Sequence, residues 1–529
     1  MENFSNEHGD VFLIKTDRMI DRGALMSRYS RTASLDIRDV YSREFINNPD
    51  RGKDFYRKIF LEYGDESVAE LTTAQVAIQN ISNIATKFIE EARVGLSYLE
   101  KSSRYVRYDK KVNGKYLFAS ADKIGLDKKY SEMYEEHCEF LFRTYAEFYP
   151  VLSDLIRKKN PVSGFRFPSG EGKDIDFDKL DETGKEAALK SYESSVRSAT
   201  LDEIRSLLPA STLTNLGISG NGRSFISLIQ RLRGTGIREC LKLADDLYGE
   251  LHSELPELID SAQSERSGRL VDYLVQINGH YTPERRTSSS EVTNLRLIKC
   301  DGRDESLDRV VSMILYNQSG LYDEIERNVA KMPRSEKENL ISTYSKLREN
   351  RRFKPGRAFE AVNFSFEITT NFGAFRDLQR HRFLGIIRKP LTAEFGYEIP
   401  ETINSSPDLR ERFVKAMEKS IEVYRVLAAL NTDIAQYCVP YAFMYPVIVN
   451  ANLREITYFS ELRSTPQAHL DLRKIANLMY GEVRRTHPEL SGIIRFVDSN
   501  NYILGRLKSE MKKEIRMKEF QNHDEKNEI

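Results

Sequence analysis

The stretch Asn371–Glu398, NFGAFRDLQRHRFLGIIRKPLTAEFGYE, places Arg380, His381 and Arg382 at the end of an apolar run with helical spacing. Arg376 and Arg380 are four residues apart, so they share one face of the predicted helix. Such a fixed cluster of cations can hold a phosphate group through paired hydrogen bonds. The alternative is a solvated basic helix end that the helix dipole favours. Features elsewhere in the chain decide between a phosphate-binding cluster and a solvated helix end.

The composition limits the classes of protein to consider. The chain has 529 residues, with 80 lysines plus arginines and 80 aspartates plus glutamates. This length predicts two or more domains. A protein that binds duplex nucleic acid usually has a basic excess, so we expect no nucleic-acid partner.

The cysteines and the N-terminal sequence indicate the cellular compartment of the protein. The four cysteines are far apart and form no CxxC, which argues against a zinc site or a disulfide framework and fits a reducing environment. The scattered histidines have no metal-ligand spacing. The N-terminal MENFSNEHGDVFLIK lacks the apolar core of a signal peptide, and no apolar run approaches the ~20 residues that span a membrane. We expect a cytoplasmic protein with no membrane partner and no metal.

The order of sequence features begins again after residues 261–291. VTNLRLIKCDG (292–302) matches DVFLIKTD (10–17), and GRAFEAVNFSFEIT (356–369) matches GDESVAELTTAQVAI (64–78). DVFLIK (10–15) is predicted to be a short strand. Strands are also predicted within 64–78 and 356–369, the latter with alternating Val362, Phe364, Phe366 and Ile368. Farther on, Pro440 pairs with Pro209, Asn452 with Asn221, Arg454 with Arg223 and Arg463 with Arg233. The chain is therefore predicted to be a tandem duplication, with a charged, helical insertion at about 125–200 in the first copy.

At this point a family resemblance can be given. Each half resembles one subunit of the flavin-dependent thymidylate synthases, whose signature is an Arg-His-Arg, then a Ser-x-Arg loop, a V-L-P segment, an N-x-R helix start and a later Leu-x-Leu-Arg. The resemblance implies an α+β fold of two tandem repeats, each a small antiparallel sheet flanked by long helices, together forming a pseudo-dimer. The implied divisions are a first repeat at 1–260, a linker at 261–291, a second repeat at 292–510 and a charged tail at 511–529.

Each half keeps only part of the signature. The first half has Glu91-Ala92-Arg93 where the Arg-His-Arg is expected, but it keeps the Ser-x-Arg loop and Arg205. The second half keeps Arg380-His381-Arg382 but has Glu394 in the loop and Gln436 before its Val-Pro. In the family each site combines residues of two subunits, so two composite sites, each built from both halves, are expected here. A glutamate facing a phosphate costs electrostatic energy, so the composite site that contains Glu91 and Glu394 should be inactive.

The other composite site keeps nearly every residue that the family uses. By resemblance, the catalytic residues are Arg463 and Ser102; the substrate-binding residues are Glu100, Ser102, Ser103, Arg104, Arg205, Arg380 and Arg463; and the cofactor-binding residues are Ser67, Glu70, Glu100, Asn221, Arg223, Arg380, His381 and Arg382. Whether such a site forms within one chain or between two chains is open.

The resemblance implies a reaction and its partners. The family converts dUMP to dTMP with methylenetetrahydrofolate as carbon donor, FAD as hydride carrier and NADPH as the usual reductant. A two-copy chain is expected to form a homodimer that imitates the family tetramer. Two alternatives remain: a flavin- and nucleotide-binding pseudoenzyme, or a structural partner of another synthase. Asp377, where the family commonly has a neutral amide, favours the pseudoenzyme.

Overall fold

The computed structural model describes residues 3–6, 8–30, 32–33, 36–63, 66–168, 174–279, 293–318 and 320–527, without the side chains of 59–63, 66–67 and 518–527. The chain divides into two compact units, each assembled from separate segments. Unit 1 comprises Met1–Lys101, Leu117–Glu135 and Ala210–Ser289; unit 2 comprises Ser102–Tyr116, Glu136–Pro209 and Ser290–Ile529. Part of the first half of the sequence therefore folds with the second half.

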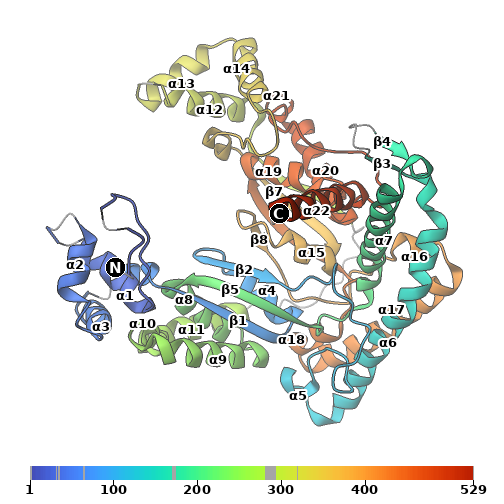
Figure 1. The fold of residues 1–529 in the computed structure, drawn as a ribbon, viewed down its shortest axis with the longest axis horizontal. Helices are drawn as coiled ribbons and strands as arrows, with labels where there is room; N and C mark the ends of the chain where they lie inside the picture. Colours follow the sequence, from blue (N-terminus) through green and yellow to red (C-terminus); the bar gives the residue numbers. More distant parts are fainter. Residues whose placement is uncertain are drawn as a thin grey trace. The chain divides into compact units, whose positions relative to one another are not determined.

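Unit 1 is built around an antiparallel sheet with strand order β1-β5-β2 (Figure 1). Its strands are β1 (Thr73–Ser82), β2 (Leu96–Glu100) and β5 (Leu213–Asn221). Its helices are α1 (Met19–Tyr29), α2 (Ile37–Glu44), α3 (Arg51–Tyr63), η1 (Glu66–Leu71), α4 (Asn83–Glu91), α5 (Ala121–Ile124), α8 (Gly222–Arg233), α9 (Arg238–Glu254), α10 (Pro256–Ile259), η5 (Asp260–Gln263) and α11 (Glu265–Gly279).

Unit 2 contains a second antiparallel sheet with strand order β6-β7-β9-β8. Its strands are β6 (Leu295–Cys300), β7 (Asn363–Asn371), β8 (Gly385–Ile387) and β9 (Met444–Asn452). Phe364, Phe366 and Ile368 alternate along β7 and are buried, which is the period of a strand with one face on a core. A separate hairpin pairs β3 (Arg166–Pro168) with β4 (Asp174–Asp176).

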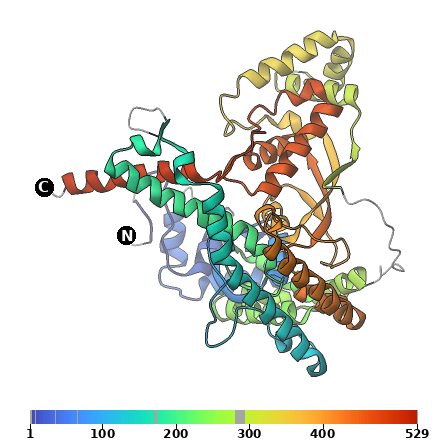
Figure 2. The same ribbon diagram turned by 90° about the vertical axis from the view of Figure 1, so that its right-hand side faces the viewer.

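The long helices of unit 2 are α6 (Lys128–Lys159), which begins in unit 1 and continues into unit 2, α7 (Glu182–Ile204), α17 (Pro407–Leu430), α20 (Leu470–Thr486) and α22 (Leu507–Asn527). The shorter ones are η2 (Val162–Gly164), η3 (Phe177–Lys179), η4 (Arg205–Leu207), α12 (Arg303–Tyr316), α13 (Tyr322–Lys331), α14 (Arg334–Lys346), η6 (Arg357–Ala361), α15 (Phe372–Leu378), α16 (Glu401–Asn404), α18 (Thr432–Ala435), η7 (Gln436–Cys438), α19 (Leu453–Arg463) and α21 (Pro488–Ser491). Of these helices, α15, α19, α20 and η6 contact the second sheet. Both views show α22 running alongside α7 (Figures 1 and 2).

Asparagine caps fix where the helices that follow the strands begin. Asn371 Oδ1 accepts from the Ala374 amide at 2.9 Å, so α15 begins directly after β7. Asn452 Oδ1 accepts from the Glu455 amide at 2.9 Å, so α19 begins directly after β9. An asparagine in this position satisfies one of the unpaired amides of the first helical turn. These caps place the ends of α15 and α19 in fixed positions.

The structure confirms the mixed α and β class, the small antiparallel sheets and the predicted strands at 64–78 and 356–369. The strand predicted at 10–15 is wrong, because Ile14 forms only an isolated bridge with Phe4. The segment predicted as a linker, 261–291, contains α11, and its residues from 280 lie outside the described part; α22 fills most of the segment predicted as a charged tail, 511–529. Among the residues described, no helix has the length and apolarity needed to cross a membrane.

Candidate functional site

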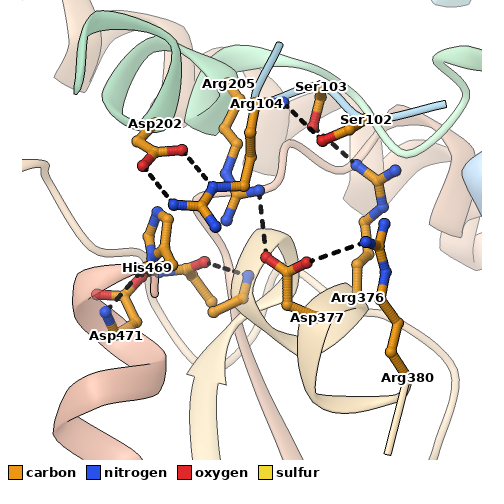
Figure 3. A network of polar contacts seen from close by, with 12 residues as sticks. Ser102, Ser103, Arg104, Asp202, Arg205, Arg376, Asp377, Arg380, His469 and Asp471 are labelled. Atoms are coloured by element: carbon orange, nitrogen blue, oxygen red, sulfur yellow. Dashed lines mark hydrogen bonds and ion pairs between the residues drawn. The ribbon is translucent and has the colours of Figure 1, made fainter. Parts of the chain in front are cut away.

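A cavity of about 500 Å³ lies within unit 2. Its lining comes from seven parts of the chain: Arg104 in the loop after β2; residues of 195–206 at and just after the end of α7; Asn371 and Gly373 at the start of α15; segment 398–404; Tyr441 and Ala442 before β9; segment 466–474; and residues of 502–506 before α22. Residues from both halves of the sequence therefore meet in one cavity. Its polar wall is a cluster of guanidinium and carboxylate groups (Figure 3).

Arg104 and Asp202 form the tightest pair of this cluster. The Arg104 Nε donates to Asp202 Oδ1 at 2.6 Å and its Nη2 donates to Oδ2 at 2.7 Å. Burial alone would raise the pKa of Asp202, but the charge and hydrogen bonds of Arg104 lower that pKa to about 2. The pair is therefore ionised at neutral pH, and Arg104 is held in a fixed orientation.

Asp377, at the end of α15, lies between two further arginines (Figure 3). Its Oδ2 is 3.6 Å from Arg205 Nη1, and its Oδ1 is 3.7 Å from Arg380 Nη1. Asp377 is buried, which by itself raises its pKa, but Arg205, Arg104 and Arg380 together hold this pKa well below its usual range. Burial lowers the pKa of Arg205 in turn. Neither Asp377 Oδ2 nor Arg205 Nη2 has a hydrogen-bond partner among the described residues.

The loop after β2 is attached to α15 by Arg376. The buried Arg376 Nη1 donates to Ser103 Oγ at 3.1 Å, and its guanidinium lies 5.0 Å from the ring centre of Tyr441. Ser102 Oγ accepts from the Arg104 amide at 3.3 Å, which shapes the turn itself. Ser102, Ser103 and Arg104 are therefore positioned against α15. The prediction that Arg376 and Arg380 share one helix face is wrong, because α15 ends at Leu378 and Arg380 lies in the turn that follows.

Arg463, at the end of α19, contacts the turn after α15. Its Nε donates to His381 Nε2 at 2.7 Å, and its Nη2 donates to the Asp377 carbonyl at 3.3 Å. Because Nε2 accepts, His381 is in its neutral form with the proton on Nδ1, the nitrogen 3.7 Å from Glu455 Oε1. Burial lowers the pKa of Arg463, although it remains a cation at neutral pH.

A second group of polar residues that line the cavity is acidic. Asn371 Nδ2 donates to Asp471 Oδ2 at 2.6 Å and to Glu398 Oε2 at 2.9 Å. His469 Nδ1 lies 3.3 Å from Asp471 Oδ2. Burial raises the pKa of both carboxyls, but His469 and hydrogen bonds lower that of Asp471 to about 2, whereas burial and the charge of Asp471 leave that of Glu398 raised. The cavity thus has a cationic wall and a wall of acceptors.

Five of the predicted residues belong to unit 1, so their relation to this cavity stays a prediction. Glu70 pairs with Arg223 at 2.7 Å, and both are about half exposed. Asn221 caps α8 through the Ser224 amide. Glu100 is buried 3.9 Å from the ammonium of Lys87. Ser67 lies in η1, and its side chain is outside the described part.

The residues that replace family arginines in the second half differ in their surroundings. Gln436 is buried, and its Oε1 accepts from the Leu391 amide at 2.9 Å, so it has a structural role. Glu394 is exposed on the loop of 391–398.

The sequence did not indicate several residues of this cavity, namely Asp202, Asn371, Glu398, His469, Asp471 and Arg506. Asp202 lies 98 residues from its partner Arg104 in a helix where nothing in the local pattern marks it. His469 belongs to the scattered histidines without metal-ligand spacing, and it is buried in the cavity wall. The one sequence feature that pointed to a carboxylate among the arginines was Asp377, which stands before Arg380 where the family commonly has a neutral amide.

Residues 19–257 and 296–489 match the family model described as thymidylate synthase complementing protein. The chain belongs to this family. A UPF0159 protein of Thermoplasma acidophilum is 50% identical over 499 residues, which cover 94% of this chain and 99% of that protein. A UPF0159 protein of Chlamydia muridarum is 34% identical over 96% of each chain. The resemblance noted from the signature residues is therefore confirmed at the level of the family.

More distant relatives of the chain carry a functional name. The flavin-dependent thymidylate synthase of Thermococcus onnurineus is 32% identical over 120 residues, which cover 22% of this chain and 48% of that protein. A solved structure of a UMP/dUMP methylase from Streptomyces cacaoi, bound with 5-Br dUMP, covers 38% of this chain at 17% identity and a TM-score of 0.31. That score is too low to establish a common fold.

Membership of the family implies a flavin, and the turn after α15 has residues of suitable chemistry. Arg382 is exposed, and Phe383 beside it exposes 82% of its surface. A guanidinium suits a diphosphate, and an exposed aromatic ring suits a flat heterocycle. His381 directly precedes them and is held by Arg463. This set of side chains fits a flavin dinucleotide.

Proposed function

We propose that the chain is an FAD-dependent thymidylate synthase that methylates dUMP at a site built from both halves of its sequence. The observation that carries this proposal is the contact of Arg376 with Ser103 at 3.1 Å. It joins the Ser-x-Arg loop of the first half to the helix that directly precedes the Arg-His-Arg of the second half, within one unit. The first half keeps this loop and has lost the Arg-His-Arg, whereas the second half keeps the Arg-His-Arg and has lost the arginine of the loop.

The side chains have distinct roles in this proposal. Arg104 and Arg205 hold the nucleotide phosphate, with Arg380 beside them, because charge-assisted hydrogen bonds favour a dianion. Ser102 donates to the nucleotide from its loop. Arg463, oriented by His381, faces the uracil and stabilises negative charge that develops on the ring.

The remaining chemistry comes from FAD, which supplies hydride transfer when bound, with NADPH as reductant and methylenetetrahydrofolate as carbon donor. His381 and Arg382 of unit 2 are proposed to hold the flavin. By the family resemblance, the further proposed flavin-binding residues are Ser67, Glu70, Glu100, Asn221 and Arg223, from the same chain or from a second copy. The chain's contribution is to orient the reactants and to place cations where charge develops.

A fused pair of repeats explains how one chain supplies both halves of such a site. The Glu70–Arg223 pair of the first half has a counterpart in Glu360–Arg454 of the second, each at 2.7 to 2.8 Å. The capping asparagines Asn221 and Asn452 are equivalent in the same way. These matches support a tandem duplication that forms a pseudo-dimer, and a homodimer of such chains would imitate the family tetramer.

Asp202 and Asp377 favour a second candidate, a protein that binds nucleotide and flavin without methylation. Both carboxylates lie among the arginines that would hold the phosphate. An anionic ligand must displace or tolerate them, which weakens binding relative to a purely cationic site.

Tritium release from dUMP labelled at C5 separates these candidates. The purified protein, with FAD, NADPH and methylenetetrahydrofolate, is expected to release tritium and form dTMP. Arg104→Ala and Arg380→Ala should each abolish dUMP binding, whereas Arg327→Ala, an exposed position on α13, should not. Bound FAD and dUMP with no tritium release would establish the pseudoenzyme instead.

A further inference from the structure

The segment 498–506, here called the C-terminal strap, follows the region 296–489 that matches the family. It is fastened to the body of unit 2 by buried groups. Arg473 Nη2 donates to the Asn500 carbonyl at 2.5 Å, and the Asp498 amide donates to Ser464 Oγ at 3.0 Å. The strap is therefore part of the folded unit, and its course is set by α20 and by the turn after α19.

The end of the strap is fixed equally closely. A Cβ at Gly505 would lie 2.2 Å from the Pro466 carbonyl oxygen, so only glycine permits this approach. Directly after the strap, α22 packs on α7, with Lys190 and Glu514 paired at 2.7 Å. Because α7 also carries Asp202 and leads into Arg205, this packing places the strap at the cavity. Tyr502, Leu504, Gly505 and Arg506 line it.

Arg506 is a buried cation that lacks a counter-charge. Its exposed fraction is 8%. Its Nη1 lies 3.5 Å from Ser198 Oγ, and its guanidinium lies 4.8 Å from the ring centre of Tyr105. Among the described residues, no carboxylate is within ion-pair distance. A buried guanidinium with only a hydroxyl and a ring for partners is costly unless an anion joins it.

A second buried guanidinium that lines the cavity, that of Arg205, also has a donor without a partner among the described residues. Arg205 exposes 4% of its surface, and its Nη2 has no hydrogen-bond partner among the described residues. Arg104, which lines the same cavity, differs because Asp202 satisfies it on two atoms. Arg205 and Arg506 therefore leave donors directed at the cavity that a ligand with several acceptor oxygens would satisfy.

We propose that Arg506 is a further substrate-binding residue, which together with Arg205 holds the phosphate monoester of the nucleotide. This assignment rests on the proposed function for the identity of the nucleotide, and on the cavity alone for the phosphate. The strap thereby adds to the site a cation from outside the family-matching region. The same chemistry would also bind free inorganic phosphate, so a test must distinguish the two sources.

The test measures binding of dUMP, deoxyuridine and inorganic phosphate by titration calorimetry to the full-length wild type, Arg506→Gln and Arg506→Lys. Lys508→Gln is the matched control, because Lys508 is an exposed cation in the first turn of α22 that pairs with Asp174. We expect Arg506→Gln to weaken dUMP binding about 10- to 100-fold, as for loss of a hydrogen bond to a charged group. Deoxyuridine binding should be unchanged, and Arg506→Lys should lie between.

Several outcomes are decisive. Equal dUMP affinity in the wild type and Arg506→Gln would overturn the inference and leave the proposed function intact. A wild type that binds phosphate through Arg506 but not dUMP would leave Arg506 as a phosphate-binding residue and overturn both its assignment to the nucleotide and the proposed function. Should Arg506→Gln fail to fold, hydrogen exchange of the wild type decides. dUMP should slow exchange in residues 498–510 more than deoxyuridine does, and equal protection by both would overturn the inference.

Discussion

Arg104 and Asp202 hold each other through two parallel hydrogen bonds of 2.6 and 2.7 Å on the wall of the cavity. The arginine that the family would use for the phosphate thus has an internal carboxylate partner. A nucleotide phosphate must compete with Asp202 for the same donors. The strength of nucleotide binding therefore depends on this pair as well as on the arginines alone.

Replacing Asp202 by asparagine should release Arg104 for the ligand. The amide keeps the size of the side chain and removes its charge, so we expect dUMP to bind up to about tenfold more tightly. The ligand-free protein should lose about 1–3 kcal/mol of its free energy of unfolding, because Arg104 loses its counter-charge. Calorimetry and urea unfolding measure the two effects. Asp408→Asn, on an exposed part of α17, is the control; weaker dUMP binding in Asp202→Asn would show that the carboxylate instead orients Arg104 for the ligand.

The same pair predicts how stability depends on pH. The pKa of Asp202 falls from 3.8 to about 2 on folding, and that of Asp377 is also lowered. A lowered carboxyl pKa stabilises the protein above the unfolded pKa, and this contribution is lost as pH falls through the folded pKa. Between pH 5 and 3, Asp202 alone should cost the wild type about 1 kcal/mol. Urea unfolding of Asp202→Asn should therefore have a shallower acid slope; parallel slopes would contradict the assignment.

Arg463→Lys tests the role of the arginine that His381 orients. Lysine keeps the charge but cannot donate to His381 and to the Asp377 carbonyl from one rigid group. We expect kcat for tritium release to fall about 100-fold, as when one stabilising donor is removed, with a smaller change in dUMP affinity. Arg484→Lys, exposed on α20, is the control. A change in KM with unchanged kcat would assign Arg463 to binding only.

Restoring one of the family residues that are replaced by Glu91, Glu394 and Gln436 should have little effect on nucleotide binding. Glu91→Arg leaves Glu394 and Gln436 in place, so we expect the number of dUMP molecules bound per chain, measured by calorimetry, to stay unchanged. Gln436 is buried and holds the Leu391 amide, which makes arginine there costly to accommodate. An additional dUMP bound by Glu91→Arg would show that charge at position 91 alone had silenced the second site.

Local patterns predicted the elements that depend on local physics. The alternation of Phe364, Phe366 and Ile368 predicted β7, and the asparagine at position 221 predicted the start of α8. Two helices were missed, α11 and α22, because polar and charged residues dominate both segments. For α22 the stabilisation comes from packing on α7, which no local pattern reveals.

Only the residues of the site that belong to the family signature could be predicted from the sequence. The family signature indicated Arg104, Arg205, Arg380 and Arg463, and the structure places all four in unit 2. Their acidic partner Asp202 was not predictable, because an ion pair between distant segments leaves no periodic trace in the sequence. Arg506 was hidden for the same reason, since its neighbours in space come from α7 and from the loop that carries Tyr105.

The hydrogen bond between Ser103 and Arg376 joins residues 273 positions apart, which has a consequence for synthesis on the ribosome. At about 5–20 residues per second, the loop of Ser103 emerges roughly 14 to 55 s before its partner has been made. Unit 1 can fold no earlier than its last segment, whereas the cavity of unit 2 also awaits the strap at 498–506. A nascent chain that has not reached residue 506 would thus display the Ser-x-Arg loop without the completed cavity, and a ligand of this cavity could stabilise only chains that include the strap.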